Sequence, residues 1–298
     1  MSIDLLGFFK EQEIEYAEQF DVSAISYIRI GGKASYAAMP NSTEKLIKLV
    51  KFLNSHQIAY KIVGGMSNIL PSDSYYPGVL IITTKCNRYY VAENTITLEC
   101  GVRLSKVIRA LAALGVCGME SLSGIPGTVG GAVRSNAGAY GCSVSDFIVS
   151  ATLYSPKEKK KITFAVGDMG MSYRKSRLIG SDLVLLSADF TFSRDDSESI
   201  FARIKSITEK RHASQPYNMP SLGSVFKRKD GIPMSLLIDR LGLKGLSVGG
   251  AQVSEKHAGF IVNTGGATAK DVLTLISILK ERIYAECGIL PEEEIEIF

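Results

Sequence analysis

The sequence lacks the features that mark membrane, secreted and zinc-binding proteins. No apolar stretch reaches the length that spans a bilayer. The N-terminal stretch MSIDLLGFFKEQEIEY has no basic segment followed by an apolar one, so we expect no signal peptide. The five cysteines are odd in number and widely spaced, with no CxxC pair. This usage favours reduced thiols, a cytoplasmic location and no metal site.

The chain also has little net charge. The formal charge is +4 over 298 residues, which is too mild to argue for nucleic acid. No run of Lys and Arg carries interleaved aromatic residues, and Lys157–Lys161 is interpreted as a solvated hairpin turn. We therefore expect no nucleic-acid, membrane or obligate protein partner, whereas small acidic ligands remain compatible.

Length and composition indicate an ordinary globular protein of about two domains. The hydrophobic fraction is 46% and the charged fraction 21%. The character of the sequence changes near residue 193, which places a domain boundary between residues 194 and 195. Strands and helices are mixed with hairpins before this point, so the expected fold class is α+β.

Hydrophobic periodicity and capping residues predict the elements along the chain. We expect helices at 1–20, 41–53, 104–114 and 197–211, one after Pro233, and one at 269–287 between Thr268 and Gly288. We expect strands on both sides of Gly31–Gly32, a strand-like tail at 291–298, and strands at 60–63, 79–84, 89–92, 95–100, 147–155, 161–165, 183–192, 224–227 and 258–263.

Between Gly124 and Gly141 the chain carries six glycines in eighteen residues, no Asp or Glu and one charge, Arg134. Apolar residues between the glycines indicate an ordered segment. Glycine lets a ligand approach backbone N–H groups, and runs of such groups bind anions. The segment thus suggests a cradle for a phosphate-bearing ligand, although a crowded corner would also need glycine. Neither GxxxxGK[ST] nor a helix-opening GxGxxG is present.

A second glycine loop follows the predicted strand at 60–63. It runs from Gly64 to Leu70 and offers Ser67 and Asn68 as side-chain donors. A plain tight turn is the alternative. Two such loops in one half of the chain together favour a ligand site.

Several motifs occur in one order along the chain: GGMSN, GIPGTVGGAV, SNAGAYG, SYRKS, LGSVFK, GLKG and SEKHAGFIVN, then an acidic tail. Together they resemble the UDP-N-acetylenolpyruvoylglucosamine reductase family of bacterial peptidoglycan synthesis. The resemblance runs from about Tyr27 to the C-terminus. The short spacing after Arg174 is similar to the subtype without an extra substrate-capping loop.

The resemblance implies a two-lobed FAD-binding domain of the FAD-linked oxidoreductase type at 1–194, with subdomains at about 1–85 and 86–194. A smaller α+β substrate-binding domain follows at 195–298, with its tail returning to the active site. FAD is expected to bind non-covalently, because Gly64–Leu70 holds no His or Cys and Cys142 is the only thiol near the glycine-rich segment. The expected FAD-binding residues are Gly64, Gly65, Met66, Ser67, Asn68, Ile69, Gly124, Ile125, Pro126, Gly127, Thr128, Gly130, Gly131, Ala132, Asn136, Ala137 and Gly138.

In this family NADPH, the co-substrate, reduces FAD, and the reduced flavin then gives hydride to the enolpyruvyl double bond before a proton completes the product. The resemblance implies Ser224 as proton donor, Arg174 on the substrate carboxylate, and Glu294 as assistant to Arg174 or to the donor. Serine is a weak acid, so Lys227, Arg174 or Glu294 through water would have to polarise it. Taken alone, Ser224 is a turn residue and Arg174 a surface cation.

The substrate implied is the enolpyruvyl ether of a UDP-sugar. Its expected contacts are Tyr173, Arg211, Gln215, Lys227, Arg228, Gln252 and Asn263. For Gln252 and Asn263, a structural role in caps and turns is as well supported by the sequence as substrate binding. We interpret His257 as a packed or capping histidine and leave it out of the catalytic set.

Some positions depart from the family pattern. Arg228 and Lys229 replace an Asn-Pro pair, and Met66 replaces a common glycine. Arg134 stands where an uncharged residue is usual, and Glu296 where a basic one is frequent. These changes leave open a diverged FAD-dependent oxidoreductase with another substrate, or a non-catalytic flavin- or nucleotide-binding relative. The presence of Arg174, Ser224 and Glu294 argues against the last alternative.

Overall fold

The computed structural model describes residues 4–298. The chain forms two compact units, each with its own hydrophobic core. The first unit contains the N-terminal segment up to Gln19, Ser35–Gly65 and Pro77–Glu209; the second contains Phe20–Ala34, Met66–Tyr76 and Lys210–Phe298. This division differs from the single break expected between residues 194 and 195, because two early segments of the chain cluster with the C-terminal part.

A four-stranded sheet opens the first unit, in the order β1-β2-β5-β3. The parallel pair β3–β5 lies at one side. Two helices, α1 (Leu5–Glu11) and α2 (Thr43–Ser55), bury Phe9, Leu46 and Leu49 in the core of this unit. The strands are β1 (Glu15–Asp21), β2 (Lys33–Met39), β3 (Tyr60–Val63) and β5 (Tyr76–Ile82).

Two predictions for this region are wrong. The helix expected over 1–20 ends at Glu11, because Glu13 takes a left-handed backbone conformation with φ of 48° and the chain then extends into β1. The strand expected before Gly31 is absent, since Ser26–Arg29 forms a hydrogen-bonded turn. The helix expected from Asn41 is confirmed, with Ser42 as its cap.

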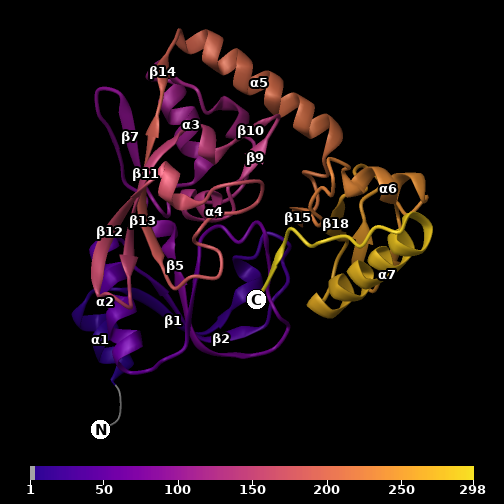
Figure 1. The fold of residues 1–298 in the computed structure, drawn as a ribbon. Coiled ribbons are helices and arrows are strands. Elements are labelled where there is room, and N and C mark those ends of the chain that lie inside the picture. Colours follow the sequence, from indigo (N-terminus) through magenta and orange to yellow (C-terminus); the bar gives the residue numbers. More distant parts are fainter. Residues whose placement is uncertain (1–3) are drawn as a thin grey trace. The chain divides into compact units, whose positions relative to one another are not determined.

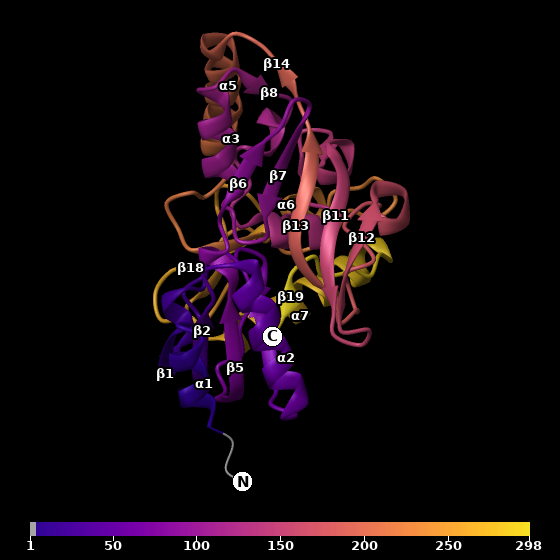
Figure 2. The same ribbon diagram turned by 90° about the vertical axis from the view of Figure 1, so that its left-hand side faces the viewer.

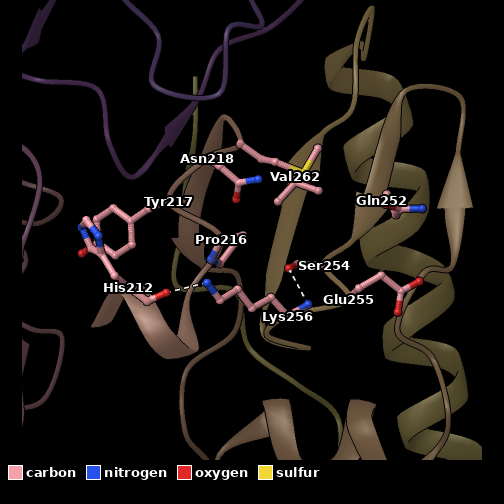
Figure 3. A pocket seen from close by; sticks show the side chains of 10 residues that line it. His212, Pro216, Tyr217, Asn218, Gln252, Ser254, Glu255, Lys256 and Val262 are labelled. Carbon is pink, nitrogen blue, oxygen red and sulfur yellow. Dashed lines mark hydrogen bonds between the residues drawn. The ribbon is translucent and has the colours of Figure 1, made fainter. Parts of the chain in front are cut away.

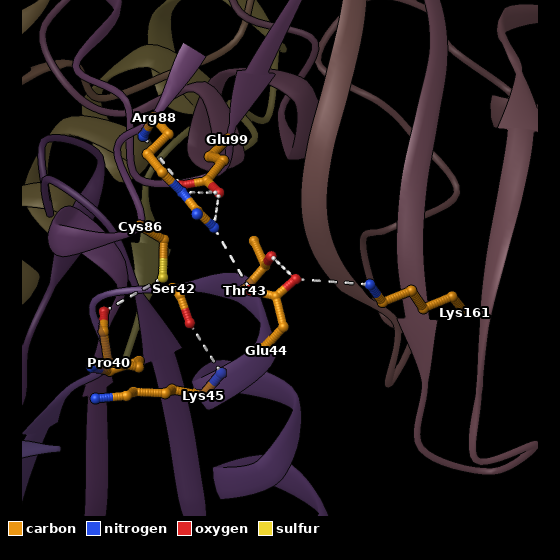
Figure 4. Close-up of polar contacts among 9 residues, drawn as sticks. All are labelled: Pro40, Ser42, Thr43, Glu44, Lys45, Cys86, Arg88, Glu99 and Lys161. Carbon is orange, nitrogen blue, oxygen red and sulfur yellow. Dashed lines mark hydrogen bonds and ion pairs between the residues drawn. The ribbon is translucent and has the colours of Figure 1, made fainter. Parts of the chain in front are cut away.

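Polar side chains join α2 to the next sheet of the same unit (Figure 4). The Ser42 hydroxyl accepts the Lys45 N–H at 3.2 Å and so caps the helix. Arg88 lies 3.4 Å from Glu44 and 2.8 Å from the buried Glu99. A hydrogen bond to its own backbone N–H lowers the pKa of Glu44. The helix start is thereby fixed to the strand that ends at Glu99.

An antiparallel five-stranded sheet forms the rest of the first unit, in the order β12-β11-β13-β7-β6 (Figure 2). Helix α3 (Leu104–Ala112) buries Leu104, Val107 and Leu111 in the same core. The strands are β6 (Tyr89–Val91), β7 (Thr95–Glu99), β11 (Ile148–Ser155), β12 (Lys160–Ala165) and β13 (Val184–Thr191). Short elements are α4 (Val129–Arg134), β8 (Val116–Cys117) with β14 (Ser193–Arg194), and β9 (Gly138–Ala139) with β10 (Cys142–Ser143).

The second unit has a four-stranded sheet in the order β15-β18-β17-β16, with α6 and α7 beside it (Figure 1). Its elements are β15 (Ser221–Ser224), α6 (Met234–Arg240), β16 (Ser247–Val248), β17 (Ala251–Val253), β18 (Phe260–Asn263) and α7 (Ala269–Cys287). Helix α7 has the predicted bounds, with a capping box of Thr268 and Asp271 and a left-handed Gly288.

Helix α5 (Ser197–Ser214) begins in the first unit and ends in the second. The strand predicted at 224–227 lies earlier, at β15, because the N–H groups of Val225 and Lys227 bond instead to Gly259 and Glu292. The mixture of helices with largely antiparallel sheets is α+β, as predicted. Within residues 4–298, every helix is too short or too polar to cross a bilayer.

Candidate active site

The glycine-rich segment forms the short helix α4 rather than an open loop. Thr128 is its N-cap residue, but the Thr128 side chain makes no capping hydrogen bond. The Gly130 N–H donates to the Cys100 carbonyl at 2.8 Å, and a Cβ at Gly130 would lie 3.0 Å from that oxygen. Glycine suits this position because the helix packs directly against the end of β7 and leaves little room for a side chain.

The two predicted cofactor loops lie against each other within the first unit. A Cβ at Gly65 would lie 2.8 Å from the Gly127 Cα atom, and one at Gly64 would lie 2.1 Å from Thr128 Oγ1. Any larger side chain at either position would collide with the second loop. The structure therefore joins Gly64–Gly65 to Gly127–Thr128, which the sequence only suggested.

Three hydroxyl groups in or just before the segment from Gly124 to Gly141 are buried without a hydrogen-bond partner: those of Ser121, Ser123 and Thr128. Buried polar groups are nearly always satisfied, and an unsatisfied one costs about 1–3 kcal/mol. No carboxylate occurs between Gly124 and Gly141. The residues present thus fit a ligand that brings hydrogen-bond acceptors, such as the diphosphate of FAD. Ser121 and Ser123 were missed from the sequence, although small polar residues directly before Gly124 were a signal.

Asn136 lies near the end of the glycine-rich motif, and its side chain forms hydrogen bonds within the protein. Its Nδ2 donates to the Ser172 carbonyl at 2.9 Å and to Ser145 Oγ at 3.2 Å, while its Oδ1 accepts the Ser145 N–H at 2.9 Å. The residue is buried, with φ of 43°. Asn136 therefore links the motif to the segment that carries Tyr173 and Arg174.

Tyr173 and Arg174 occupy a tight turn closed by two hydrogen bonds between Ser172 and Lys175, at 3.0 and 3.1 Å. Arg174 has φ of 54°, a left-handed conformation that costs a non-glycine residue about 1–3 kcal/mol. Its guanidinium lies 5.2 Å from the Tyr173 ring centre, and Nη2 donates to the Gly138 carbonyl at 3.3 Å. Strain of this kind is typical of functional positions.

Ser224 and Glu294 come together in the second unit through the main chain. The Glu294 N–H donates to the Val225 carbonyl at 2.7 Å, directly after Ser224. On the other side of the tail, the Asn68 side chain donates to the Glu294 carbonyl at 3.0 Å, and the Glu296 N–H donates to the Asn68 carbonyl at 2.9 Å.

Strand β19 (Glu296–Ile297) then pairs in parallel with β4 (Ile69–Leu70). The tail thus connects two residues of the predicted catalytic set with the loop predicted to bind FAD.

Met66 lies in this loop with φ of 47°, in the region that favours glycine. This conformation explains why glycine is common at the position. The side chain is buried, and the Met66 carbonyl accepts the Tyr27 N–H at 3.3 Å.

The predicted substrate residues have different surroundings. Arg211 is only 9% exposed, and its Nε and Nη1 atoms are buried without a partner. Its Nη2 lies 3.4 Å from Gln215 Oε1. Lys227 forms an ion pair with Glu292, whereas Arg228 is exposed. The Nε and Nη1 atoms of Arg211 are hydrogen-bond donors that suit an anion such as phosphate.

Asn263 has a structural part in the second unit. Its Nδ2 donates to the Ile28 carbonyl at 3.0 Å, and its Oδ1 accepts the N–H groups of Gly265 and Ala267. These contacts use both side-chain polar atoms of Asn263 within a turn. This is the role in caps and turns that the sequence left open beside substrate binding.

Relatives of known identity extend over nearly the whole chain. It is 40% identical over 291 residues to the UDP-N-acetylenolpyruvoylglucosamine reductase of Caldicellulosiruptor bescii, covering 97% of this chain and 92% of the relative. The reductase of Clostridioides difficile is 37% identical over 296 residues, covering 99% of this chain and 96% of the relative. The chain belongs to the UDP-N-acetylenolpyruvoylglucosamine reductase family. The predicted resemblance is confirmed.

Two family models match different parts of this chain. The FAD binding domain model matches residues 34–160, and the C-terminal domain model of UDP-N-acetylenolpyruvoylglucosamine reductase matches residues 215–298. The crystal structure of the reductase from Thermus caldophilus has a TM-score of 0.80 and 28% identity, covering 96% of this chain and 98% of that chain. Both glycine loops lie in the FAD model, and Ser224 and Glu294 lie in the other.

The second unit of the chain also holds a pocket of about 460 Å³ (Figure 3). Gln252 lines it, with Nε2 bonded to the Gly245 carbonyl at 3.3 Å and to Ser247 Oγ at 3.1 Å. Lys256 Nζ donates to the His212 carbonyl, and the rings of His212 and Tyr217 lie 4.4 Å apart. Of these lining residues only Gln252 was expected to contact the substrate. Ser254, Glu255, Lys256 and Val262 belong to the SEKHAGFIVN motif, whereas His212 and residues 216–219 belong to no motif that the sequence indicated.

Proposed function

We propose that this chain reduces UDP-N-acetylglucosamine enolpyruvate to UDP-N-acetylmuramate, with FAD as cofactor and NADPH as reductant. Arg174, Ser224 and Glu294 are the catalytic residues in this proposal. Residues 1–194 bind FAD, and residues 195–298 bind the substrate. The proposal rests above all on the pairing of Glu294 with Val225, because it places a carboxylate-bearing tail beside the predicted proton donor.

The glycine loops and their hydroxyl groups would hold FAD. Bound FAD, once reduced, supplies the hydride that the enolpyruvyl double bond takes up. Thr128, Ser121 and Ser123 carry buried hydroxyls that lack partners, and these would donate to the phosphate oxygens of the cofactor. The close contact of Gly65 with Gly127 keeps the two loops together as one binding surface.

Arg174 and Ser224 have separate roles in the reaction of the substrate. Arg174 binds the substrate carboxylate and stabilises the negative charge that develops there. The Ser224 hydroxyl donates a proton to the adjacent carbon. Lys227 forms an ion pair with Glu292, and the proposal assigns the hydroxyl of Ser224 to Glu294 instead. Glu294, whose backbone is held beside Val225, orients the hydroxyl.

Arg211 is assigned to the diphosphate of the substrate. Its buried guanidinium has two nitrogen atoms without partners, and a phosphate would satisfy both. Changing Arg211→Lys keeps the charge but removes the fork of donors. We expect the KM for the UDP-sugar to rise about tenfold or more, because a hydrogen bond to a charged group contributes roughly 1.5–3 kcal/mol. Reduction of FAD by NADPH is expected to continue at its normal rate.

The deciding experiment uses the purified protein loaded with FAD. NADPH is expected to bleach the yellow protein, and the enolpyruvyl UDP-sugar is expected to restore the colour with formation of UDP-N-acetylmuramate. Ser224→Ala should retain bleaching but lose about 10²–10⁴ in product formation. Ser277→Ala, on the exposed side of α7, is the control. Full turnover by Ser224→Ala, or a protein that takes up no FAD, contradicts the proposal.

We also propose that the enzyme works in the cytoplasm without an obligate protein partner. The five cysteines are free thiols in the structure, which suits a reducing compartment. Cell fractionation and a measurement of activity with the purified chain alone test both points.

A further inference from the structure

Arg134 is the charged residue of the glycine-rich motif, and its guanidinium bonds to the protein rather than only to solvent. It is the last residue of α4 and is half-buried. Nη1 donates to the Leu178 carbonyl at 2.7 Å. Leu178 itself is buried, and it lies four residues after Arg174 in the chain. The side chain of Arg134 therefore bridges the motif and the segment after the turn.

A second bond joins the same two segments in the opposite direction. The Ser176 hydroxyl donates to the Arg134 carbonyl at 2.5 Å and also accepts the Leu178 N–H at 3.2 Å. Ser176 is buried. Side chain and main chain of Arg134 are thus both bonded to the segment from Ser176 to Leu178.

The other end of the turn is attached to the same motif. Asn136, two residues after the end of α4, donates from Nδ2 to the Ser172 carbonyl, so bonds from Arg134 and Asn136 reach both sides of the turn. Between these anchors, Arg174 keeps a left-handed conformation. A strained residue retains such a conformation only where the surrounding structure fixes it. The anchors at Ser172, Ser176 and Leu178 provide that restraint.

We propose that Arg134 is a positioning residue, which holds the Ser172–Leu178 segment so that the Arg174 guanidinium is presented to the substrate carboxylate. The inference rests on the catalytic role proposed for Arg174. Arg134 touches neither substrate nor flavin in this proposal and acts only through Arg174. A misplacement of about 1 Å in such a group lowers turnover by up to about a hundredfold.

The test measures kcat for product formation and, separately, the rate of FAD reduction by NADPH. Arg134→Met is expected to lower kcat about ten- to a hundredfold while FAD reduction stays within about twofold. Arg134→Lys, which can still reach the carbonyl with one donor, is expected to recover most of the loss. Ser135→Ala is the matched control, because its hydroxyl bonds to the Gly131 carbonyl within α4.

A double-mutant cycle decides whether Arg134 acts through Arg174. In the Arg174→Lys background, a further Arg134→Met change is expected to cost less than about twofold, because the group being positioned is already altered. Ser176→Ala, which removes the hydrogen bond to the Arg134 carbonyl but leaves every side chain of α4 unchanged, is expected to behave in the same non-additive way. The inference is overturned if Arg134→Met and Ser176→Ala lower kcat by the same factor in the Arg174→Lys background as in the unmodified protein. It is also overturned if FAD reduction falls as much as turnover. A failure of Ser224→Ala to lose product formation would instead count against the proposed function alone.

Discussion

The two units hold the proposed catalytic residues by different means. In the first unit, Arg174 sits in a strained turn whose anchors are side chains, namely Arg134, Asn136 and Ser176. In the second unit, Ser224 and Glu294 are held mainly by hydrogen bonds between backbone groups of β15, the tail and the Asn68 loop.

This difference predicts different sensitivities to mutation. Side-chain anchors fail when one residue is replaced, because each bond depends on a particular functional group. A backbone ladder survives most side-chain replacements and fails when an N–H group is removed, as proline does. The four predictions below test this contrast, from the largest expected effect to the smallest.

Arg174→Ala is expected to have the largest effect. Removing the cation that stabilises developing charge lowers kcat by about 10²–10³. Arg177→Ala is the matched control from the same segment, since Arg177 lies over the Phe164 ring at 4.8 Å and bonds to the Asp168 carbonyl. Turnover is measured by product formation. Equal losses for the two variants would show that the segment matters only as structure.

Glu296→Pro tests the backbone side of the comparison. It removes the N–H that donates to the Asn68 carbonyl and leaves that carbonyl unpaired, at a cost of about 1–3 kcal/mol in tail docking. We expect faster hydrogen exchange in β4 and a loss of turnover of about tenfold or more. Glu296→Gln keeps the N–H and is expected to stay within about twofold. If the two variants behave alike, the ladder does not hold the tail.

Thr128→Val examines a side chain of the first unit that has no partner of its own. Replacing a buried, unpaired hydroxyl by a methyl group is expected to stabilise the FAD-free protein by roughly 1 kcal/mol. The same change is expected to weaken FAD binding severalfold, because one donor is lost. Thermal melting without FAD and titration with FAD measure the two effects. Effects of the same sign would remove Thr128 from the FAD site.

His257→Gln is expected to have the smallest effect, in the second unit. Burial lowers the pKa of His257 below 6.5, and the nearby Lys244 adds to this effect. A backbone hydrogen bond and Asp239 act in the opposite direction without cancelling it. The Gly259 N–H donates to Nδ1 at 3.1 Å, which suits the neutral ring. A lowered pKa makes the folded state resist protonation, so this contribution is present above pH 6.5 and is lost as the pH falls below it. The variant should flatten the dependence of Tm on pH below 6.5; an unchanged slope contradicts this assignment.

The sequence predicted the elements whose signals are local. Helix α7 has its expected bounds because Thr268, Asp271 and Gly288 mark both ends. The start of α2 and most strands of the five-stranded sheet were predicted for the same reason. The helix expected over 1–20 failed because its apolar residues continue into β1, where a different period applies.

The site was predictable in its motifs but not in its internal bonds. Gly64, Gly127 and Thr128 belong to recognisable loops, and the structure adds that they touch. That Asn136 bonds to Ser172 and Arg134 to Leu178 depends on contacts between segments about forty residues apart, which no local pattern encodes. The position of Lys227 beside Glu292 is of the same kind.

The pairing of the tail with the Asn68 loop has a consequence for how the protein folds. The Asn68 side chain and the Glu294 carbonyl are separated by 226 residues in the chain. Closing so long a loop costs entropy before any contact compensates for it, so contacts of this kind form late. We therefore expect refolding to produce the core of the first unit early and the pairing of β4 with β19 among the last steps, so that recovery of turnover lags behind recovery of helical structure.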